Sequence, residues 1–369
     1  MKRLLERPLC VAVILILAAV VLLYTVSEWL KQREIRAAEA DLALLAASTA
    51  PLPSVKNGID ALWLLEYRTA SDDERADLMR RFGNVIQYDN DASVKYPELA
   101  AKYLSPSDDT LKFNGTATEY LVEIRANLPK YRAEAEKQAE LFANVDKLVD
   151  YDTFVPRDWP NKEEDFFKIR LPRFQFIVIG HTLAALDWAQ GKESEAWRRV
   201  CRNIKTGRSL LHNRPGLIYP MIGNAIILRN TDLAAQMLYE KPEWANHLPD
   251  ECSGMFDVLS EQEQGLCLAM QDEFHLVTNL SLKLEGKGWQ MMQVQEWREL
   301  MALGEEQSDA ATDFVLLALP RFDAAHSLAM AAPHYAAFCK PAATAVFRAD
   351  RKVQWPRRLP KRLPGNGRA

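Results

Sequence analysis

The stretch "PRFQFIVIGHTLAALDWAQGKESEAWRRVCRNIKTGRSLLHNRPGLIYPMIGNAIILRNTDLAAQML", residues 172–238, decides the fold class of this chain. Its first part, from Phe174 to Ala189, is apolar almost all round, which is typical of a helix buried at the centre of a domain. Gly191 follows at the position where a left-handed residue closes a helix. The pattern predicts a central buried helix that ends in a tight turn.

Two further segments of this stretch carry a helical pattern. Apolar residues from Trp197 onward recur mostly at steps of three or four, with arginines and lysines between them. Pro215 and Gly216 then turn the chain into a third helix, which we expect Asn230 to end, with Thr231 capping a short fourth helix. Helix, tight turn and helix, repeated, predict a bundle of antiparallel α-hairpins.

The rest of the chain extends this pattern in both directions. No alternating run is long enough for a strand, so the expected fold class is all-α. We expect an N-terminal helical subdomain at residues 55–150, in which residues 88–117 form a long surface connection, and a main helical-hairpin domain at residues 170–345. Pro129 either kinks a helix or begins a new one. Residues 348–369 are rich in Pro and Arg without any period and predict a basic disordered tail.

An uncharged apolar run occupies residues 9–26. A helix of this length can cross about 30 Å of hydrocarbon with some tilt. No small-residue cleavage site follows the run, so we expect it to be retained as a signal anchor. A cleaved signal peptide and a buried soluble helix are the alternatives. Residues 27–50 are rich in Ala, Leu, Glu and Arg and predict a helical stalk.

The charges on either side of the run indicate its orientation. Lys2, Arg3 and Arg7 precede it, whereas acidic and basic residues are mixed after it. Positive charge held inside favours residues 1–8 in the cytoplasm and the bulk of the chain outside it. The basic residues after the run leave the opposite orientation open. We therefore expect a single-pass protein of the bacterial inner membrane, contacting lipid through residues 9–26, with a periplasmic body.

The net charge excludes one class of partner. Of 369 residues, 48% are hydrophobic and 26% charged, an ordinary globular composition. The formal charge of −4 hides an asymmetry, because the chain from Arg348 onward carries eight Lys or Arg and one Asp, a net of +7, which leaves −11 for the rest. An acidic body with a basic tail is not the pattern of a nucleic-acid binder, so no nucleic-acid partner is expected. The tail could bind anionic lipid or an acidic partner surface, or could have no specific role.

Five cysteines are present, and Cys10 belongs to the apolar run. Cys201, Cys252, Cys267 and Cys339 could form disulfides in an oxidising compartment, in any of three pairings. Cys252 and Cys267 are nearest in sequence and form the candidate disulfide. Free buried thiols remain the alternative, since an unpaired Cys behaves as a small apolar residue.

Candidate catalytic residues are few. Asp272 and His275 are three apart on a predicted helix, so they share a face and could act as an acid–base pair, but we favour a solvated or capping ion pair, because neighbouring charges on helix faces are common. His181 lies in the most apolar helix, where it is a ligand, a base or a core histidine with one hydrogen bond. Zinc-ligand spacings, phosphate-binding loops and nucleophile elbows are absent from the sequence. We therefore predict no catalytic, cofactor-binding or metal-binding residue.

The segment "GWQMMQVQEW", residues 288–297, could line a groove for a partner helix or pack in a core.

Three stretches resemble an uncharacterised group of proteobacterial proteins that have an N-terminal membrane anchor and an all-helical body. They are "NGIDALWLL" (57–65), "LAALDWAQGKESEAWRRV" (183–200) and "LIYPMIGNAIILRN" (217–230). The second also resembles the junction of a tetratricopeptide-type helix pair, although no period of about 34 residues repeats along the chain. The resemblance implies a location in the bacterial envelope and implies no activity.

These observations predict a membrane-anchored periplasmic scaffold or protein-binding module, with a protein partner and no identifiable catalytic mechanism. The alternative is a periplasmic hydrolase or lyase with an active site in a helical cleft. A deep polar pocket that gathers a histidine would favour the enzyme, and an exposed apolar groove would favour the binding module.

Overall fold

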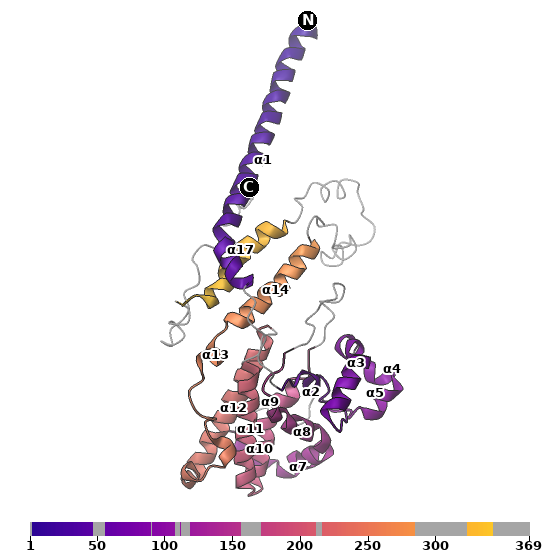
Figure 1. Cartoon of the computed structure of the whole chain (residues 1–369), viewed down its shortest axis with the longest axis vertical. Helices are drawn as coiled ribbons and strands as arrows, with labels where there is room; N and C mark the ends of the chain where they lie inside the picture. The colour runs from indigo at the N-terminus through magenta and orange to yellow at the C-terminus, as the bar shows by residue number, and fades with distance from the viewer. Residues whose placement is uncertain are drawn as a thin grey trace. The chain divides into compact units, whose positions relative to one another are not determined.

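The computed structural model of the chain describes residues 2–46, 56–89, 91–107, 111, 119–155, 171–211, 216–284 and 323–341. Helices account for most of these residues, and the only extended pairings among them are two isolated β-bridges, Asn57 with Thr153 and Tyr67 with Tyr103. The predicted all-α class is therefore confirmed (Figure 1). The predicted basic tail at 348–369 and the segment 288–297 lie outside the described residues.

The chain divides into two compact units. We call Ala50–Ala269 the body, and we call Met1–Thr49 together with Met270–Ala369 the terminal unit. The expected main domain at 170–345 differs from this division, because its last part belongs to the terminal unit. The helical patterns of the sequence mark the elements but carry no signal for which elements pack into one core.

The first half of the body consists of short helices. They are α2 (Ile59–Trp63), α3 (Asp72–Tyr88), α4 (Ala92–Lys95), α5 (Pro97–Lys102), α6 (Tyr120–Ala126), α7 (Leu128–Lys137), α8 (Ala139–Asp146) and the 3-10 segment η2 (Lys147–Asp150). A proline stands in the first turn of α7, so Pro129 begins a new helix rather than kinking an existing one.

The expectation of a long surface connection at 88–117 is wrong for its first part, where α4 and α5 lie. Ala92 and Leu99 are fully buried and form an apolar cluster with Leu78 and Ile86 of α3. Helices of four and six residues complete barely one turn, so they leave no periodic pattern in the sequence.

The second half of the body contains the predicted central helices. They are α9 (Gln175–Val178), α10 (Gly180–Ala189), α11 (Glu193–Leu211) and α12 (Ile218–Glu240). All but two residues of α10 are buried, as the apolar pattern predicts. Gly191 has φ +78°, which confirms the left-handed turn between α10 and α11. The single helix expected from Phe174 to Ala189 is interrupted at Ile179, between α9 and α10.

Helices α11 and α12 approach each other at two glycines. A Cβ atom on Gly223 would lie 2.6 Å from the carbonyl oxygen of Gly207, and one on Gly207 would lie 2.9 Å from that of Gly223. Both distances are shorter than van der Waals contact, and the clashing atoms belong to the backbone, so only glycine permits this approach.

The expected break at Asn230 is wrong, because α12 continues through it to Glu240. The Asn230 side chain is fully buried and donates from Nδ2 to the Ile226 carbonyl oxygen at 2.8 Å. It also accepts a hydrogen bond at Oδ1 from Nδ2 of Asn203 on α11, at 3.0 Å. These partners satisfy the amide inside the helix, so it does not compete with the helical backbone.

Cys252 forms a disulfide with Cys201, with their Cα atoms 5.0 Å apart. The expected pairing of Cys252 with Cys267 is therefore wrong. Cys201 lies on the buried face of α11, and the short segment η5 (Asp250–Cys252) packs against that helix, so the fold brings together residues 51 positions apart. Cys267 and Cys339 are disulfide-bonded as well.

The remaining elements of the body are η4 (Pro242–Asn246) and α13 (Glu261–Gln264).

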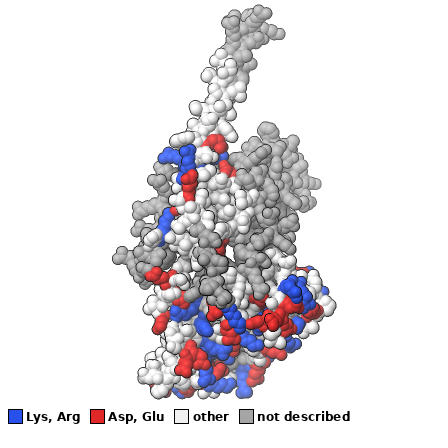
Figure 2. Space-filling view, in the orientation of Figure 1, with Lys and Arg blue, Asp and Glu red and all other residues white. Residues whose placement is uncertain are grey.

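The terminal unit begins with α1 (Lys2–Ala46), a single helix of 45 residues. Between Val11 and Trp29 its large apolar side chains are exposed, from 46% for Val26 to 69% for Leu23. This stretch shows hardly any charged side chain in Figure 2. The predicted spanning segment 9–26 includes residues 9, 10, 13 and 16, whose side chains lie outside the described part. Within the described residues, no helix is both long and apolar enough to span a bilayer.

The end of α1 packs against two C-terminal helices of the same unit, α14 (Cys267–Leu284, from Met270 onward) and α17 (Ala324–Ala336), the latter followed by η7 (Ala337–Cys339). Leu45 of α1 forms a small buried cluster with Phe274, Ala332 and Ala336. Two ion pairs also join α1 to the α17 region, Lys31–Asp323 at 3.5 Å and Asp41–Lys340 at 2.6 Å. His326 of α17 and Glu34 of α1 form a hydrogen bond at 2.5 Å. The predicted stalk at 27–50 is helical over its described part, which ends at Ala46, and Leu45 in the last turn of α1 is buried in this cluster.

Candidate functional site

The predicted acid–base residues belong to the terminal unit and not to the body, whose pockets are described below. Asp272 and His275 lie on α14, where the His275 side chain is exposed and the Asp272 side chain half-buried. Neither residue lines either of the two pockets described below. Their role as an acid–base pair stays a hypothesis without support from the geometry.

His181 lies in the core of the body, with only 1% of its surface exposed. Its Nδ1 donates to the Val178 carbonyl oxygen at 2.8 Å, and its ring packs on that of Tyr120 with centroids 4.6 Å apart. Burial lowers the pKa of the imidazole to about 4, against the opposing effect of the Val178 hydrogen bond. His181 is therefore neutral at pH 7, and the interpretation as a core histidine with one hydrogen bond is confirmed.

The larger pocket of the body is a groove of about 580 Å³ formed by α7, α8, α10 and the start of α11. We call it the α7–α10 groove. Its lining comprises Arg132, Ala135, Glu136, Ala139, Phe142, Ala143, Asp146, Leu183, Leu186, Asp187, Gln190, Lys192 and Arg199. The volume lies within the range of ligand-binding clefts.

Small side chains keep the groove open. Ala135, Ala139 and Ala143 follow one another at steps of four along α7 and α8, and Ala139 and Ala143 are exposed. Ala139 and Ala143 are four apart on α8 and share one face of that helix, so a larger side chain at either position would project into the groove. Phe142, Leu183 and Leu186 provide the rest of the apolar lining.

An ion-paired triad provides part of the polar lining. Arg199 of α11 donates from Nε to Oδ2 of Asp187 on α10, at 3.0 Å. The same guanidinium donates from Nη1 to both carboxylate oxygens of Asp146 on α8, at 2.7 Å each. Side-chain exposure is 18% for Arg199, 14% for Asp187 and 29% for Asp146, so the triad is largely desolvated.

The electrostatics of the triad follow from this desolvation. Burial raises the pKa of the Asp187 carboxyl, although the adjacent Arg199 acts in the opposite direction. Burial by itself would lower the pKa of the Arg199 guanidinium, but the two carboxylates outweigh it and raise that pKa. One cation thus lies between two anions, and the triad carries a net charge of −1.

The other charged groups of the groove are more exposed. Arg132 donates to Glu136 one turn later on α7 at 2.8 Å, and both side chains are about two-thirds exposed. The exposed Lys192 stands in the turn that follows α10. The groove therefore combines apolar surface, a half-buried negative charge and a solvated charged rim.

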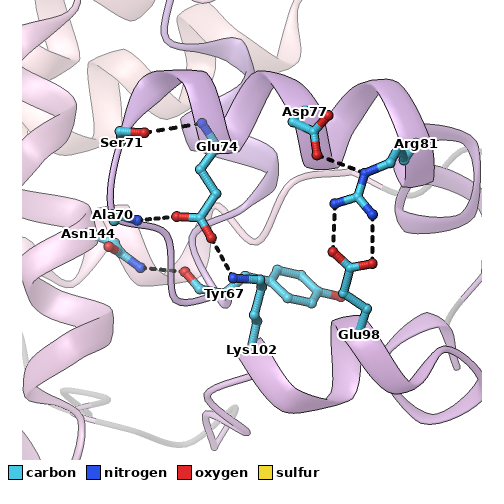
Figure 3. Close-up of polar contacts among 9 residues, drawn as sticks. All are labelled: Tyr67, Ala70, Ser71, Glu74, Asp77, Arg81, Glu98, Lys102 and Asn144. Atoms are coloured by element: carbon cyan, nitrogen blue, oxygen red, sulfur yellow. Dashed lines mark hydrogen bonds and ion pairs between the residues drawn. The ribbon is translucent and has the colours of Figure 1, made fainter.

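A second pocket, of about 420 Å³, lies beside the start of α3. Its charged lining is already used within the fold. The Glu74 carboxylate accepts a hydrogen bond from the Ala70 backbone N–H at 2.5 Å and pairs with Lys102, as Figure 3 shows. Ser71 caps α3 by accepting from the Glu74 backbone N–H at 3.2 Å. These bonds hold the start of α3, so we assign Glu74 and Lys102 a structural role.

Neighbouring contacts support that assignment. Asn144 donates from Nδ2 to the carbonyl oxygens of Leu65 and Tyr67, at 3.0 Å each. Arg81 and Glu98 form a bidentate pair at 2.6 Å that joins α3 to α5 (Figure 3). No group of three or more His, Cys, Asp or Glu that could hold a metal ion occurs in the described part of the chain.

Sequence reasoning did not find the α7–α10 groove. The alanines at steps of four were the available signal, but the same pattern also suits an ordinary packing face. The three charged residues of the triad are spread over 53 positions and meet only in the folded chain.

Comparison of this chain with protein-family models, with curated proteins and with solved structures finds no match.

Proposed function

We propose that this chain is a single-pass membrane protein whose helical body lies in the periplasm and binds a protein partner in the α7–α10 groove. The observation that carries the proposal is the groove itself, in which the exposed methyl groups of Ala139 and Ala143 stand beside a charged rim on a helical scaffold.

The membrane anchor is supported by α1. Exposed apolar side chains surround this helix between Val11 and Val26, and such a surface is costly in water. A helix satisfies its own backbone hydrogen bonds, which a lipid environment demands. The basic residues before the apolar run support a cytoplasmic N-terminus.

A periplasmic body is supported by the cysteines. Cys201 and Cys252 are joined, and Cys267 and Cys339 are disulfide-bonded too. Disulfides persist in oxidising compartments and are rare in the cytosol. The resemblance to envelope proteins of proteobacteria agrees with this location.

A hairpin scaffold is supported by the order of contacts between α11 and α12. Gly207 meets Gly223, and Asn203, one turn earlier on α11, bonds Asn230, which comes later on α12. Such a reversed order is that of antiparallel helices. The three-residue turn between α10 and α11 supports a second hairpin of the same kind.

Topology can be tested with reporters fused to the C-terminus. We expect alkaline phosphatase to be active there and a cytosol-dependent fluorescent protein to be dark. The chain should also stay in the membrane fraction after alkaline extraction, with its N-terminus intact. The reverse reporter pattern, or a processed chain in the soluble fraction, would contradict the proposal.

Partner binding can be tested by photo-crosslinking in cells. A photoreactive amino acid in place of Gln190, on the rim of the groove, should give a specific adduct with one protein. Ala139→Trp should abolish that adduct because the indole fills the groove. Ala133→Trp is the matched control, since Ala133 is exposed on α7 and does not line the groove. An adduct that survives Ala139→Trp would remove the groove from the proposal.

A further inference from the structure

The α7–α10 groove is lined by equal numbers of positive and negative side chains, but these are unevenly distributed between its interior and its rim. The triad of Asp146, Arg199 and Asp187 retains one negative charge in a largely desolvated position. Arg132 and Glu136 neutralise each other. The remaining cation of the lining, Lys192, is exposed; no ion pair of Lys192 is found within the described part of the chain, although its charge acts to lower the pKa of Asp187. Solvent screens an exposed charge far more than a half-buried one, so the interior of the groove is electronegative.

The triad also has more hydrogen-bond acceptor positions on its carboxylates than Arg199 fills with its N–H donors. Two carboxylates offer about eight lone-pair positions, whereas Arg199 directs Nε to Asp187 and Nη1 to both oxygens of Asp146. Asp187 receives a hydrogen bond on Oδ2 alone among the described residues. An incoming donor can therefore bond to the triad without displacing Arg199, whereas an incoming anion would have to displace a carboxylate.

The apolar lining suits the stem of a long cationic side chain. Ala139 and Ala143 present exposed methyl groups to the same groove as the triad, and Phe142, Leu183 and Leu186, each at most 6% exposed, form its floor. Arginine and lysine bury an alkyl stem along apolar surface while their charged head seeks a carboxylate. Arginine adds a planar fork of N–H donors that matches a carboxylate edge.

We infer that the α7–α10 groove recognises a cationic side chain, arginine or lysine, presented by the protein partner. This inference rests on the proposed function, because it names the chemistry of the same groove. The alkyl stem packs on the apolar lining, and the charged head bonds to Asp187 beside Arg199. The residual negative charge of the triad becomes neutral when the side chain is bound.

The test uses two probes of equal shape that differ in charge, N-acetyl-L-arginine methylamide and its neutral citrulline counterpart. Binding to the full chain in detergent micelles is measured by isothermal titration calorimetry at low salt. We expect the arginine probe to bind about five- to ten-fold more tightly than the citrulline probe, in line with a partly screened ion pair. Equal affinities, or no saturable binding of the arginine probe, would overturn the inference.

Three variants locate the preference. Asp187→Asn keeps an acceptor for Arg199 and removes the residual charge, so the preference for the arginine probe should vanish. Ala139→Trp leaves all charges in place and should block both probes. Asp232→Asn is the matched control, because Asp232 is an exposed acidic residue of α12 outside the groove, and it should keep the preference. A preference that persists in Asp187→Asn would show that the probe binds elsewhere on the acidic chain and would overturn the inference.

The outcome is separable from the proposed function. If the crosslink from position 190 disappears in Ala139→Trp but persists in Asp187→Asn, the groove binds a partner but does not recognise a cationic side chain. In that case the inference fails and the proposed function stands. If the crosslink also persists in Ala139→Trp, the groove is not the binding site, and both fail. Circular dichroism of each variant confirms that its helical content is retained.

Discussion

The body and the terminal unit are both helical and both have ion pairs between helices, but they differ in how many large apolar side chains they bury. The body buries large side chains completely, among them Trp197, Tyr219 and Phe176, each 1% exposed or less. The terminal unit has a small buried cluster around Leu45 and Phe274, with ion pairs beside it.

The difference bears on where stability lies. Burying a large apolar side chain contributes about 1.5–3 kcal/mol, whereas an exposed ion pair contributes about 0–1 kcal/mol. We therefore expect the free energy of unfolding to be concentrated in the body. Ion pairs stand beside a much smaller buried cluster in the terminal unit, so we expect salt to affect a larger share of its stability than of the body's. We thus expect a stable body joined to a less stable terminal unit, which carries the predicted membrane segment.

The largest expected effect comes from Trp197→Ala. This side chain is fully buried, and truncating a buried aromatic residue costs about 3–5 kcal/mol through lost contacts and the cavity left behind. Urea unfolding of the full chain and hydrogen exchange of α10–α12 should both show the loss, with smaller changes in α17. Tyr239→Ala is the control, because Tyr239 is 90% exposed. Equal losses in the two variants would contradict the assignment of the core.

The next effect comes from removing the disulfide with Cys201→Ala and Cys252→Ala together. Loss of a bond that closes a loop of this length should cost about 2–4 kcal/mol. Hydrogen exchange should accelerate in α11 and in residues 242–260, with little change in α17. Cys252→Ala alone should behave like the double variant, and a stability equal to the parent would show that the bond does not form.

A third prediction concerns pH and tests the body alone. His181 has its pKa lowered to about 4 by burial, so the unfolded chain takes up this proton more readily than the folded one. The stability that the neutral imidazole provides is therefore lost as pH falls from about 6.5 towards 4. Between pH 7 and pH 5 we expect about 2 kcal/mol of loss. His181→Leu should remove this contribution from the pH dependence, and an unchanged profile would contradict it.

The smallest effect concerns the terminal unit. Asp41→Asn removes the partner of Lys340, an ion pair whose side chains are 16% and 47% exposed. We expect a loss of about 0.3–1 kcal/mol, seen as faster hydrogen exchange in α17 and reduced at high salt. A double-mutant cycle with Lys340→Gln isolates the pair. A coupling energy above about 2 kcal/mol between Asp41 and Lys340 would contradict the expectation that ion pairs stabilise the terminal unit only weakly.

Local patterns predicted the central helices well. The continuous apolar sequence of α10 reflects burial on all sides, and the three- and four-residue steps of α11 reflect burial on one side. The spacing of apolar residues along the sequence is enough to reveal both. They failed for α4 and α5, which are too short to display a period. They also failed at Asn230, because its partner Asn203 lies on another helix and satisfies an amide that local rules treat as a helix breaker.

The candidate site was beyond such patterns. Asp146, Asp187 and Arg199 each look like ordinary surface charges on their own helices. Their desolvation and their pairing arise only when α8, α10 and α11 pack together. The histidine at 181 was the exception, since its apolar neighbours in the sequence already indicated burial.

The sequence by itself determined the helical class, the left-handed turn at Gly191 and the burial of His181, because each depends on neighbours within one or two helical turns. Only the tertiary structure decided the Cys201–Cys252 pairing, the continuity of α12 and the charged groove, because these depend on contacts between residues far apart in the chain. Such contacts follow from the packing of whole helices, which no local period specifies.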